Sequence, residues 1–440
     1  MGQNSSFQFQ NQELFNMRIN LIVPPNPYLG DDMRNPPLGL LYMAAVAEKN
    51  EIDVKITDLR GKQIDTFKKE LSNSDIYGIT AATPDYHLAL QIAKFTKSLN
   101  PESWVVLGGT HATAVPQSID SVFDKVVIGE GEHIMLDIVR DFEAKKDNKR
   151  LYHAEQITDL DALPFPAYHL MPFDSAFSKS AFSVKGAPAA AIMTSRGCPY
   201  ACSFCASSSM WHRKVRFRSP DNVINEIKKV MQTYGINYFR FHDDTMTLRS
   251  NRLEELCTKI GRLGIKWRAA TRIDSSSRES FIMMKNAGCE EIALGIESLC
   301  QEALDKSDKK IKVEDSKRIV HLAKEIGLDT RLYFIIGLPG EKPGFTDRLI
   351  QFVNETKPDG IDVSTLVPYP GSDIYANPEK YGIKLKEQDF SKYHMTLGLK
   401  NGEIDREFAF VHDVMAEEEL KKERESAIKF IKSHNLVKNF

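Results

Sequence analysis

Short runs of β-branched residues alternate with amphipathic helical patterns along most of this 440-residue chain. In the N-terminal part, helical patterns such as 38–49 and 86–99 separate the predicted strands, at a spacing typical of a doubly wound parallel sheet. These predicted strands are 18–23, 54–57, 76–80, 104–107 and 125–128. The alternation predicts a Rossmann-like α/β domain whose ligand binds at the carboxyl ends of the strands.

Prolines interrupt the pattern between residues 157 and 176, and proline disfavours both helices and central strands. The alternation then resumes, with helical patterns after most strands. The predicted strands of this second part are 189–194, 238–242, 266–270, 291–296, 331–336 and 361–367. Six β/α units are fewer than the eight of a closed barrel, so we expect a partial (β/α)6 barrel of the TIM type.

Five segments follow from this pattern. We expect a flexible N-terminus at 1–16, a Rossmann-like domain at 17–150, a linker at 151–187, a partial barrel at 188–375 and a small helical cap at 376–440.

The charge balance constrains the partners. Lys and Arg total 58 against 60 Asp and Glu, a net charge of -2, which gives no broad electrostatic footprint for nucleic acid or a membrane surface. The best local basic patch is the RKVRFR segment at 213–218. We find no apolar run long enough to span a bilayer and no secretory signal pattern, and we expect a protein of the reducing cytoplasm.

Three of the six cysteines, Cys198, Cys202 and Cys205, form a CxxxCxxC loop just after the first predicted barrel strand. Thiolates are soft ligands that select iron–sulfur clusters, zinc or copper(I). A cubane cluster normally takes four cysteines, so three would leave one iron open to another ligand. The alternative is a four-coordinate zinc site in a non-catalytic binding module, for which His212 is the nearby fourth ligand.

This loop resembles the signature of the radical S-adenosylmethionine superfamily, in which the residue before the last cysteine is aromatic, here Phe204. The resemblance implies a 4Fe-4S cluster whose open iron binds the amino and carboxylate groups of S-adenosylmethionine. One electron from the cluster then cleaves that molecule to a 5′-deoxyadenosyl radical. The resemblance also implies an electron donor such as flavodoxin or ferredoxin.

Further segments resemble the superfamily's S-adenosylmethionine-binding motifs. Asp243 and Asp244 stand in place of its Gly-Gly-Glu motif, Glu297 in its ribose motif, and Gly337 in its GxIxGxxG adenine motif, where Tyr333 replaces the first glycine. Arg272, just past the third barrel strand, is a candidate for the carboxylate. Each has an ordinary structural alternative, such as a helix N-cap for the two aspartates or a surface salt bridge for Arg272.

A doubly wound domain ahead of a radical domain is similar to the cobalamin-dependent branch of the superfamily. Matching segments include PPLGL at 36–40, LGGTHA at 107–112, GEGE at 129–132, LPFPAY at 163–168 and PYPGS at 368–372. The resemblance implies cobalamin contacts at Leu38, Gly39, Thr80, Thr83, Gly108, Gly109, Thr110, His111, Gly129, Glu130 and Gly131. Asp85-Tyr86-His87 lacks the glycine of the cobalt-ligating Asp-x-His-x-x-Gly motif, so we expect His87 and His111 to be peripheral to the cobalt.

We therefore hypothesise a cobalamin-dependent radical methyltransferase that moves a methyl group from methylcobalamin to an unactivated carbon or phosphorus of a small molecule or peptide. The alternative within the branch is a radical enzyme that does not methylate, such as a cyclase. A thiomethylating tRNA modifier is disfavoured because no cysteine precedes Cys198. The catalytic residues are open, with Tyr369 and Tyr333 as candidates, and Tyr393 and His394 are further residues that could face the substrate.

Overall fold

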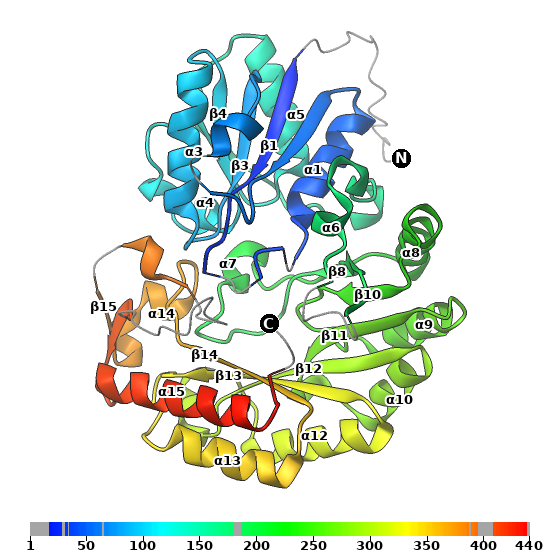
Figure 1. Cartoon of the computed structure of the whole chain (residues 1–440), viewed down its shortest axis with the longest axis vertical. Coiled ribbons are helices and arrows are strands. Elements are labelled where there is room, and N and C mark those ends of the chain that lie inside the picture. Colours follow the sequence, from blue (N-terminus) through cyan, green and yellow to red (C-terminus); the bar gives the residue numbers. More distant parts are fainter. Residues whose placement is uncertain are drawn as a thin grey trace, which may run out of the picture.

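The computed structural model describes residues 17–28, 31–33, 35–63, 66–179, 186–386, 389–394 and 408–437. Two parallel six-stranded sheets dominate it, the first in the upper half of Figure 1 and the second in the lower half. The predicted α/β fold class, a doubly wound domain followed by a partial barrel, is confirmed.

The first sheet has the strand order β2-β1-β3-β4-β5-β6, and every pairing is parallel. Its strands are β1 (Arg18–Val23), β2 (Asp53–Asp58), β3 (Ile76–Thr80), β4 (Trp104–Gly108), β5 (Lys125–Ile128) and β6 (Leu151–His153). The chain leaves β1 for β2 on one side and then crosses to β3 on the other. The carboxyl edge between β1 and β3 is therefore a topological switch point, where such sheets bind ligands.

Helices cover both faces of this sheet. The core on one face includes residues of α1 (Leu38–Lys49) and α5 (Gly131–Glu143). The core on the other face includes residues of the short α2 (Phe67–Glu70), α3 (Tyr86–Leu99) and α4 (Thr110–Ala114). Burying both faces explains the near-continuous apolar runs of the strands.

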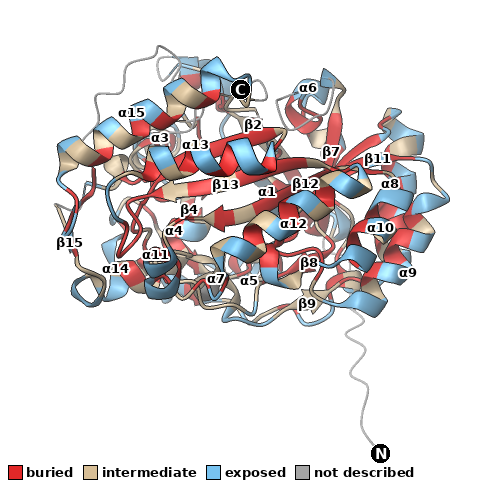
Figure 2. Ribbon diagram, turned by 90° about the horizontal axis from the view of Figure 1, so that it is seen from below, coloured by how far each residue is buried: buried red, intermediate tan, exposed pale blue. Residues whose placement is uncertain are grey.

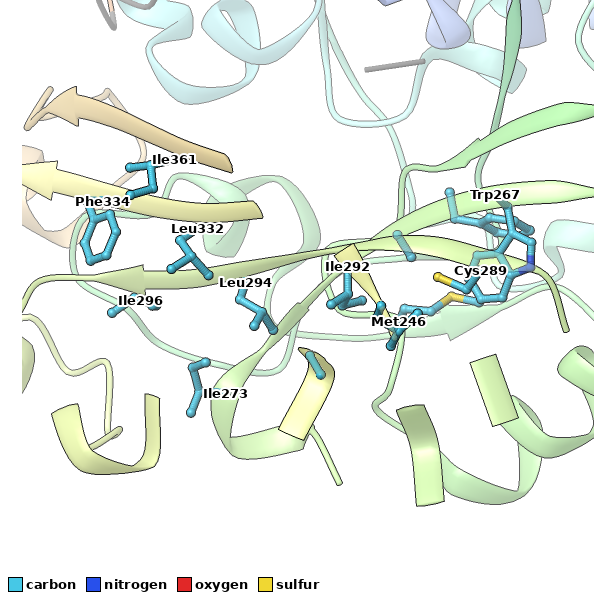
Figure 3. Packing of buried hydrophobic residues seen from close by; sticks show 14 of the residues in the cluster. Met246, Trp267, Ile273, Cys289, Ile292, Leu294, Ile296, Leu332, Phe334 and Ile361 are labelled. Atoms are coloured by element: carbon cyan, nitrogen blue, oxygen red, sulfur yellow. The ribbon is translucent and has the colours of Figure 1, made fainter. Parts of the chain in front are cut away.

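The second sheet has the order β14-β13-β12-β11-β10-β7, with β7 and β14 at its two edges. Its strands are β7 (Ala189–Ile192), β10 (Tyr238–Phe241), β11 (Lys266–Arg272), β12 (Cys289–Glu297), β13 (Asp329–Ile336) and β14 (Gly360–Thr365). The helices that follow them are α8 (Pro220–Tyr234), α9 (Ser250–Gly261), α10 (Arg278–Asn286), α11 (Gln301–Lys306), α12 (Val313–Ile326) and α13 (Phe345–Thr356). Trp267, Leu294 and Phe334 belong to the large core between this sheet and its helices (Figure 3).

The segment after β14 differs from the expected helical cap. It contains α14 (Asp373–Ala376), an antiparallel hairpin of β15 (Ile383–Leu385) and β16 (Phe410–His412), and α15 (Glu417–Ser433). Helix α15 packs on α13 and β14, with its buried residues toward the barrel and its exposed ones outward (Figure 2). It therefore occupies the place of the helix that follows the last strand of the barrel.

The expected linker is also more ordered than its prolines suggest. It begins with β6, so the first sheet extends beyond residue 150. It continues through short 3-10 turns and α6 (Phe173–Ala176). The hydroxyl of Tyr168 donates to the carbonyl of Ala191 in β7 at 2.7 Å, and the N–H of Ala167 donates to the carbonyl of Leu41 in α1 at 3.1 Å. These bonds tie the segment to both sheets.

None of the helices in the described part of the chain is long and apolar enough to cross a bilayer.

Candidate functional site

The cysteine loop lies between β8 (Ser195–Arg196) and α7 (Ser207–Trp211), between the two sheets in Figure 1. It starts at Gly197, whose φ of +100° is in the left-handed region, and a Cβ there would overlap the carbonyl oxygen of Lys214. Only glycine fits this position. The N–H of Cys205 donates to the carbonyl of Cys202 at 3.0 Å, which closes the loop into a tight turn.

Arg272, at the end of β11, supports this loop. Its Nη1 donates to the sulfur of Cys202 at 3.1 Å, and its guanidinium lies 3.7 Å from the ring centre of Tyr200. Asp274 accepts from Nε and Nη2, and the carbonyl of Lys309 also accepts from Nη2 at 2.6 Å. The residue is 5% exposed, so its salt bridge with Asp274 is largely buried and does not lie at the surface.

The two neighbouring aspartates have different surroundings. The buried carboxylate of Asp243 accepts bonds from the backbone and hydroxyl of Thr194 and from the hydroxyl of Ser195, directly before the cysteine loop. Asp244 is exposed and accepts one bond from the hydroxyl of Ser207 at 3.1 Å. Burial raises the pKa of Asp243, although its hydrogen bonds oppose that shift. Asp243 thus supports the chain that leads into the loop, whereas Asp244 faces outward beside it.

Glu297, at the end of β12, has an unusual backbone. Its φ is +69°, and the register of β12 against β13 shifts between Gly295 and Glu297. Its Oε1 pairs with Nζ of Lys309 at 2.7 Å, and both side chains are largely buried. A side chain at Gly295 would overlap this carboxylate. Strained backbone at a bulge is a feature of functional sites.

The remaining residues predicted to bind S-adenosylmethionine are more peripheral. Gly337 has a φ of +82°, and a Cβ there would meet Leu420 of α15 at 3.1 Å. This glycine therefore makes room for α15. Phe204 packs against the barrel core. Tyr333, a candidate catalytic residue, is half-buried on β13.

A cavity of about 250 Å³ lies at the carboxyl edge of the first sheet. Six glycines line it, together with apolar side chains of α1 and of the central strands, and Met193, Arg196, Met210 and Trp211 close it from the barrel side. A Cβ on Gly39 would meet no atom within 4 Å, so this lining position leaves open space. At Gly109, which has a φ of +95°, a Cβ would approach the carbonyl of Ala81 to 2.8 Å. Part of the cavity wall is thus bare backbone.

Most residues predicted to contact cobalamin lie along this edge. Gly39, Thr80, Gly108, Gly109, Gly129, Glu130 and Gly131 line the glycine-rich cavity, and Thr83 and Thr110 line a second one. Leu38 and His111 do not belong to either lining. Leu38 packs in the barrel core, and His111 is fully buried between Tyr86 and Phe390, where burial lowers its pKa to about 4.

The second cavity, of about 350 Å³, adjoins the cysteine loop. Its lining includes Ala206, which directly follows Cys205, and Tyr28, Tyr369 and His394. The rings of Tyr28 and His394 stack at 4.3 Å with 9° between their planes. Met210 of α7 lines both cavities, so they lie on two sides of the same short helix. Tyr393 is fully buried, so it does not face this space.

The RKVRFR segment points largely inward. Arg216 pairs with Glu130 at 2.5 Å, and Arg218 pairs with Glu226 at 2.5 Å, all with side chains that are at most 9% exposed. Arg213 and Lys214 remain exposed. Two of the segment's four charges therefore serve the interior, and the other two lie at the surface.

Comparisons with known proteins agree with this geometry. Residues 32–139 match the family model of the B12 binding domain, and residues 192–353 match that of the radical SAM superfamily. An uncharacterized methyltransferase of Pyrococcus horikoshii is 32% identical over 386 residues, which cover 82% of each chain. The chain belongs to the cobalamin-binding radical S-adenosylmethionine enzymes.

Two further relatives show the breadth of this family. The anaerobic magnesium-protoporphyrin IX monomethyl ester cyclase of Rubrivivax gelatinosus is 28% identical over 84% of this chain and 71% of its own. The solved structure of TsrM from Kitasatospora setae, a radical S-adenosylmethionine methyltransferase with cobalamin and a [4Fe-4S] cluster bound, superposes with a TM-score of 0.64. It shares 16% identity and covers 85% of this chain and 78% of its own, which establishes a common fold.

The cofactors of this cobalamin-binding radical enzyme are a 4Fe-4S cluster, S-adenosylmethionine and cobalamin, as predicted. The thiols fit a cluster because the three cysteines lie in one tight loop, closed by the bond from Cys205 to Cys202, and thiolates are the soft ligands that iron–sulfur clusters take. Within the described residues, no three His, Cys, Asp or Glu side chains form a site for one metal ion. A cubane imposes a different geometry, because each cysteine binds a different iron. The glycine-rich part of the cavity wall fits the close approach of part of a bulky ligand such as cobalamin.

Sequence reasoning assigned no role to two residues of the candidate site. Lys309 contacts both Glu297 and Arg272, and Thr245 lies with its hydroxyl 3.9 Å from the sulfur of Cys198. Lys309 lies outside every recognisable motif, so only the fold reveals it. Thr245 directly follows Asp244, so its closeness to the segment that replaces the Gly-Gly-Glu motif could have indicated a place in the site.

Proposed function

We propose that this enzyme is a cobalamin-dependent radical methyltransferase that methylates an unactivated carbon or phosphorus of a small molecule. The observation that supports it is the arrangement around α7, where Met210 separates a glycine-lined cavity from a cavity beside the cysteine loop. A methyl carrier and a radical generator need such adjacent sites. The name of the Pyrococcus horikoshii relative, a methyltransferase, supports the same choice.

For the cluster we propose Cys198, Cys202 and Cys205 as ligands. Arg272 donates to the sulfur of Cys202, and hydrogen bonds to cluster sulfurs tune the reduction potential. When bound, the cluster supplies the electron that cleaves S-adenosylmethionine. The hydroxyls of Thr194 and Ser195 donate to the buried carboxylate of Asp243, which holds the chain directly before the loop in place.

For S-adenosylmethionine we propose Asp244 on the amino group and Glu297 on the ribose. Asp244 is the exposed member of the aspartate pair, so its carboxylate has capacity for a charge-assisted bond. Lys309 beside Glu297 is a cation close to the same site. Arg272 is already engaged by Asp274 and Cys202, so we no longer assign it to the carboxylate.

For the substrate we propose the cavity beside the loop. Among the described residues that line it there is no Asp, Glu, Lys or Arg, and the aromatic rings of Tyr28, Tyr369 and His394 contribute to its wall. Such a lining favours an apolar, uncharged part of a small molecule over a phosphate or carboxylate. Tyr369 is the candidate for direct contact, whereas Tyr333 lies on β13 and is not among the described residues of this lining. A flavodoxin or ferredoxin is the electron donor we expect.

The test uses S-adenosylmethionine with a deuterated methyl group, after anaerobic reconstitution with iron, sulfide and hydroxocobalamin. We expect about four irons and one cobalt per chain, S-adenosylhomocysteine in turnover, and the labelled methyl group in a small-molecule product. A variant with all three loop cysteines changed to alanine is the control and yields no product. Product formation with 5′-deoxyadenosine but without S-adenosylhomocysteine would instead favour a non-methylating reaction, as the name of the cyclase relative suggests.

A further inference from the structure

Four buried charges join the two domains directly in front of the cysteine loop. Arg196 Nη1 lies 2.5 Å from Glu130 and its Nη2 lies 2.7 Å from Glu132. Arg216 Nη1 lies 2.5 Å from the other oxygen of Glu130 and donates to the carbonyl of Ile157 at 2.6 Å. We call these four residues, Glu130, Glu132, Arg196 and Arg216, the ionic clamp.

The clamp has no net formal charge and is largely buried. It contains two guanidinium groups and two carboxylates, and each side chain is between 4% and 9% exposed. Removing one partner of a buried pair leaves an uncompensated charge, so the set acts as a unit. The planar fork of Arg196 bridges two carboxylates in a way that lysine does not reproduce.

The two arginines belong to the small hairpin that carries the loop. Arg196 in β8 pairs with Arg216 in β9 (Arg216–Phe217), and Arg196 is separated from Cys198 only by Gly197. Because Gly197 is confined between Lys214 and Trp211, a shift of Arg196 has to move the start of the loop. The position of Arg196 thus fixes where the loop begins.

The acidic half of the clamp belongs to the cobalamin-binding domain. Glu130 precedes α5 and Glu132 lies in its first turn, and both line the glycine-rich cavity, as does Arg196 itself. A ligand that fills this cavity therefore contacts the same side chains that hold the cysteine loop. Glu130, which the sequence suggested as a cobalamin contact, has both carboxylate oxygens engaged by arginine.

From this geometry we infer that the ionic clamp couples the cobalamin pocket to the cysteine loop, so that each cofactor binds more tightly when the other is present. Glu130, Glu132 and Arg196 are positioning residues in this scheme. Coupling between two binding sites is reciprocal, so it is measurable from either side. The inference rests on the cofactors of the proposed function and not on methyl transfer itself.

The experiment measures the Kd of the full-length protein for hydroxocobalamin by anaerobic equilibrium dialysis, once with the reconstituted cluster and once without it. The ratio of the two values is the coupling factor. We expect binding to be at least about five-fold tighter in the cluster-loaded wild type, the lower end of typical couplings. A direct contact between a clamp residue and hydroxocobalamin changes both Kd values by the same factor, so it cancels in the ratio.

Two variants test the clamp. E132Q removes one carboxylate without changing shape, and R196K keeps the charge but loses the fork; both are expected to bring the coupling factor close to one while retaining iron. The matched control is D137N on the exposed side of α5, where Asp137 pairs with Arg140 at the surface. This variant is expected to keep the wild-type factor.

Equal Kd values in the wild type would overturn the inference, and this measurement needs no variant to fold. A wild-type coupling factor in E132Q and R196K would also overturn it, because coupling would then bypass the clamp. If hydroxocobalamin bound neither form, the cobalamin assignment would fail together with the inference. Failure to find a methylated product would leave the coupling factor intact, so the two failures are distinguishable.

Discussion

At the residue scale, the cysteine loop depends on one glycine as much as on its cysteines. Gly197 has both a left-handed backbone and no space for a Cβ. Many glycines of this chain meet only the first condition. Gly235, which ends α8, has a φ of +70°, but a Cβ at this position would meet no atom within 4 Å. Substitutions at these two positions therefore distinguish the cost of backbone strain from the cost of steric overlap.

We predict that G197A lowers the free energy of unfolding by about 3 kcal/mol or more, because left-handed strain adds to the overlap with Lys214. It should also reduce iron incorporation, since the loop starts at this residue. The matched control G235A should cost about 1 kcal/mol and keep its iron. Urea denaturation and iron analysis measure both effects, and equal losses in the two variants would contradict the steric argument.

Asp85 gives the protein a pH dependence. Its Oδ1 is buried and has no hydrogen-bond partner among the residues that the structure describes, and burial together with the nearby Asp32 raises the pKa of this carboxyl to about 7. In the unfolded chain an aspartate has a pKa of about 3.9. The folded protein therefore binds the proton of this carboxyl more tightly than the unfolded chain does. The contribution of that proton to the free energy of unfolding is fully present below about pH 4 and is lost as the pH rises to about 7.

We predict that D85N is more stable than the wild type at pH 8, by on the order of 3 kcal/mol, because the amide carries no charge to desolvate. At pH 4 the two proteins should have the same stability, since the carboxyl is then protonated. Urea denaturation at both pH values measures the difference. A gain that is equal at pH 4 and pH 8 would show that the carboxyl's ionisation is not its cause.

At the element scale, the sequence predicts most of the regular structure. Helices α1 and α3 begin and end where the sequence pattern places them. Helix α3 has an apolar stripe of helical period that faces a sheet, whereas α1 is apolar on nearly all sides and is largely buried. Buried parallel strands such as β3 and β5 are equally clear as short β-branched runs. In each case the pattern lies within one short segment, so a single sequence is enough to predict the element.

Elements that depend on distant partners escape this reasoning. Strand β6 has only three residues, and it forms because it pairs with β5 at the edge of the sheet. Helix α15 looks like a free amphipathic helix, and only its contacts with β14 and α13 place it in the barrel wall. Within the site, motifs single out Arg272 and Glu130 as candidates, but their partners lie 70 and 66 residues away and only the fold reveals them.

The place of α15 gives a test. Leu420 is 2% exposed and contacts the position of Gly337, so its removal opens a cavity between helix and barrel. We predict that L420A lowers the free energy of unfolding by about 2–5 kcal/mol. The neighbouring exposed Glu418 supplies the control, since E418A should change stability by less than about 0.5 kcal/mol. Similar small effects in both would mean that α15 is a detachable cap, as its sequence pattern suggests.

At the scale of the whole molecule, the two domains share more than the ionic clamp. Leu38 and Leu41 of α1 belong to the same apolar core as the barrel strands, although α1 follows the first strand of the other sheet. Tyr168 of the expected linker is 3% exposed in that same core. Independent domains usually meet through polar surfaces, whereas a continuous core makes their unfolding cooperative.

We therefore predict that L41A destabilises both domains together, by about 2–5 kcal/mol. Tryptophan fluorescence reports each domain separately when W211F and W267F leave only Trp104 in β4, or when W104F and W211F leave only Trp267 in β11. In each background the fluorescence transition in urea should coincide with the transition seen by far-ultraviolet circular dichroism, and L41A should shift both signals equally. Leu41 lies in the cobalamin-binding domain by sequence. A shift confined to the Trp104 signal would therefore show that the two domains unfold separately, despite the core that they share.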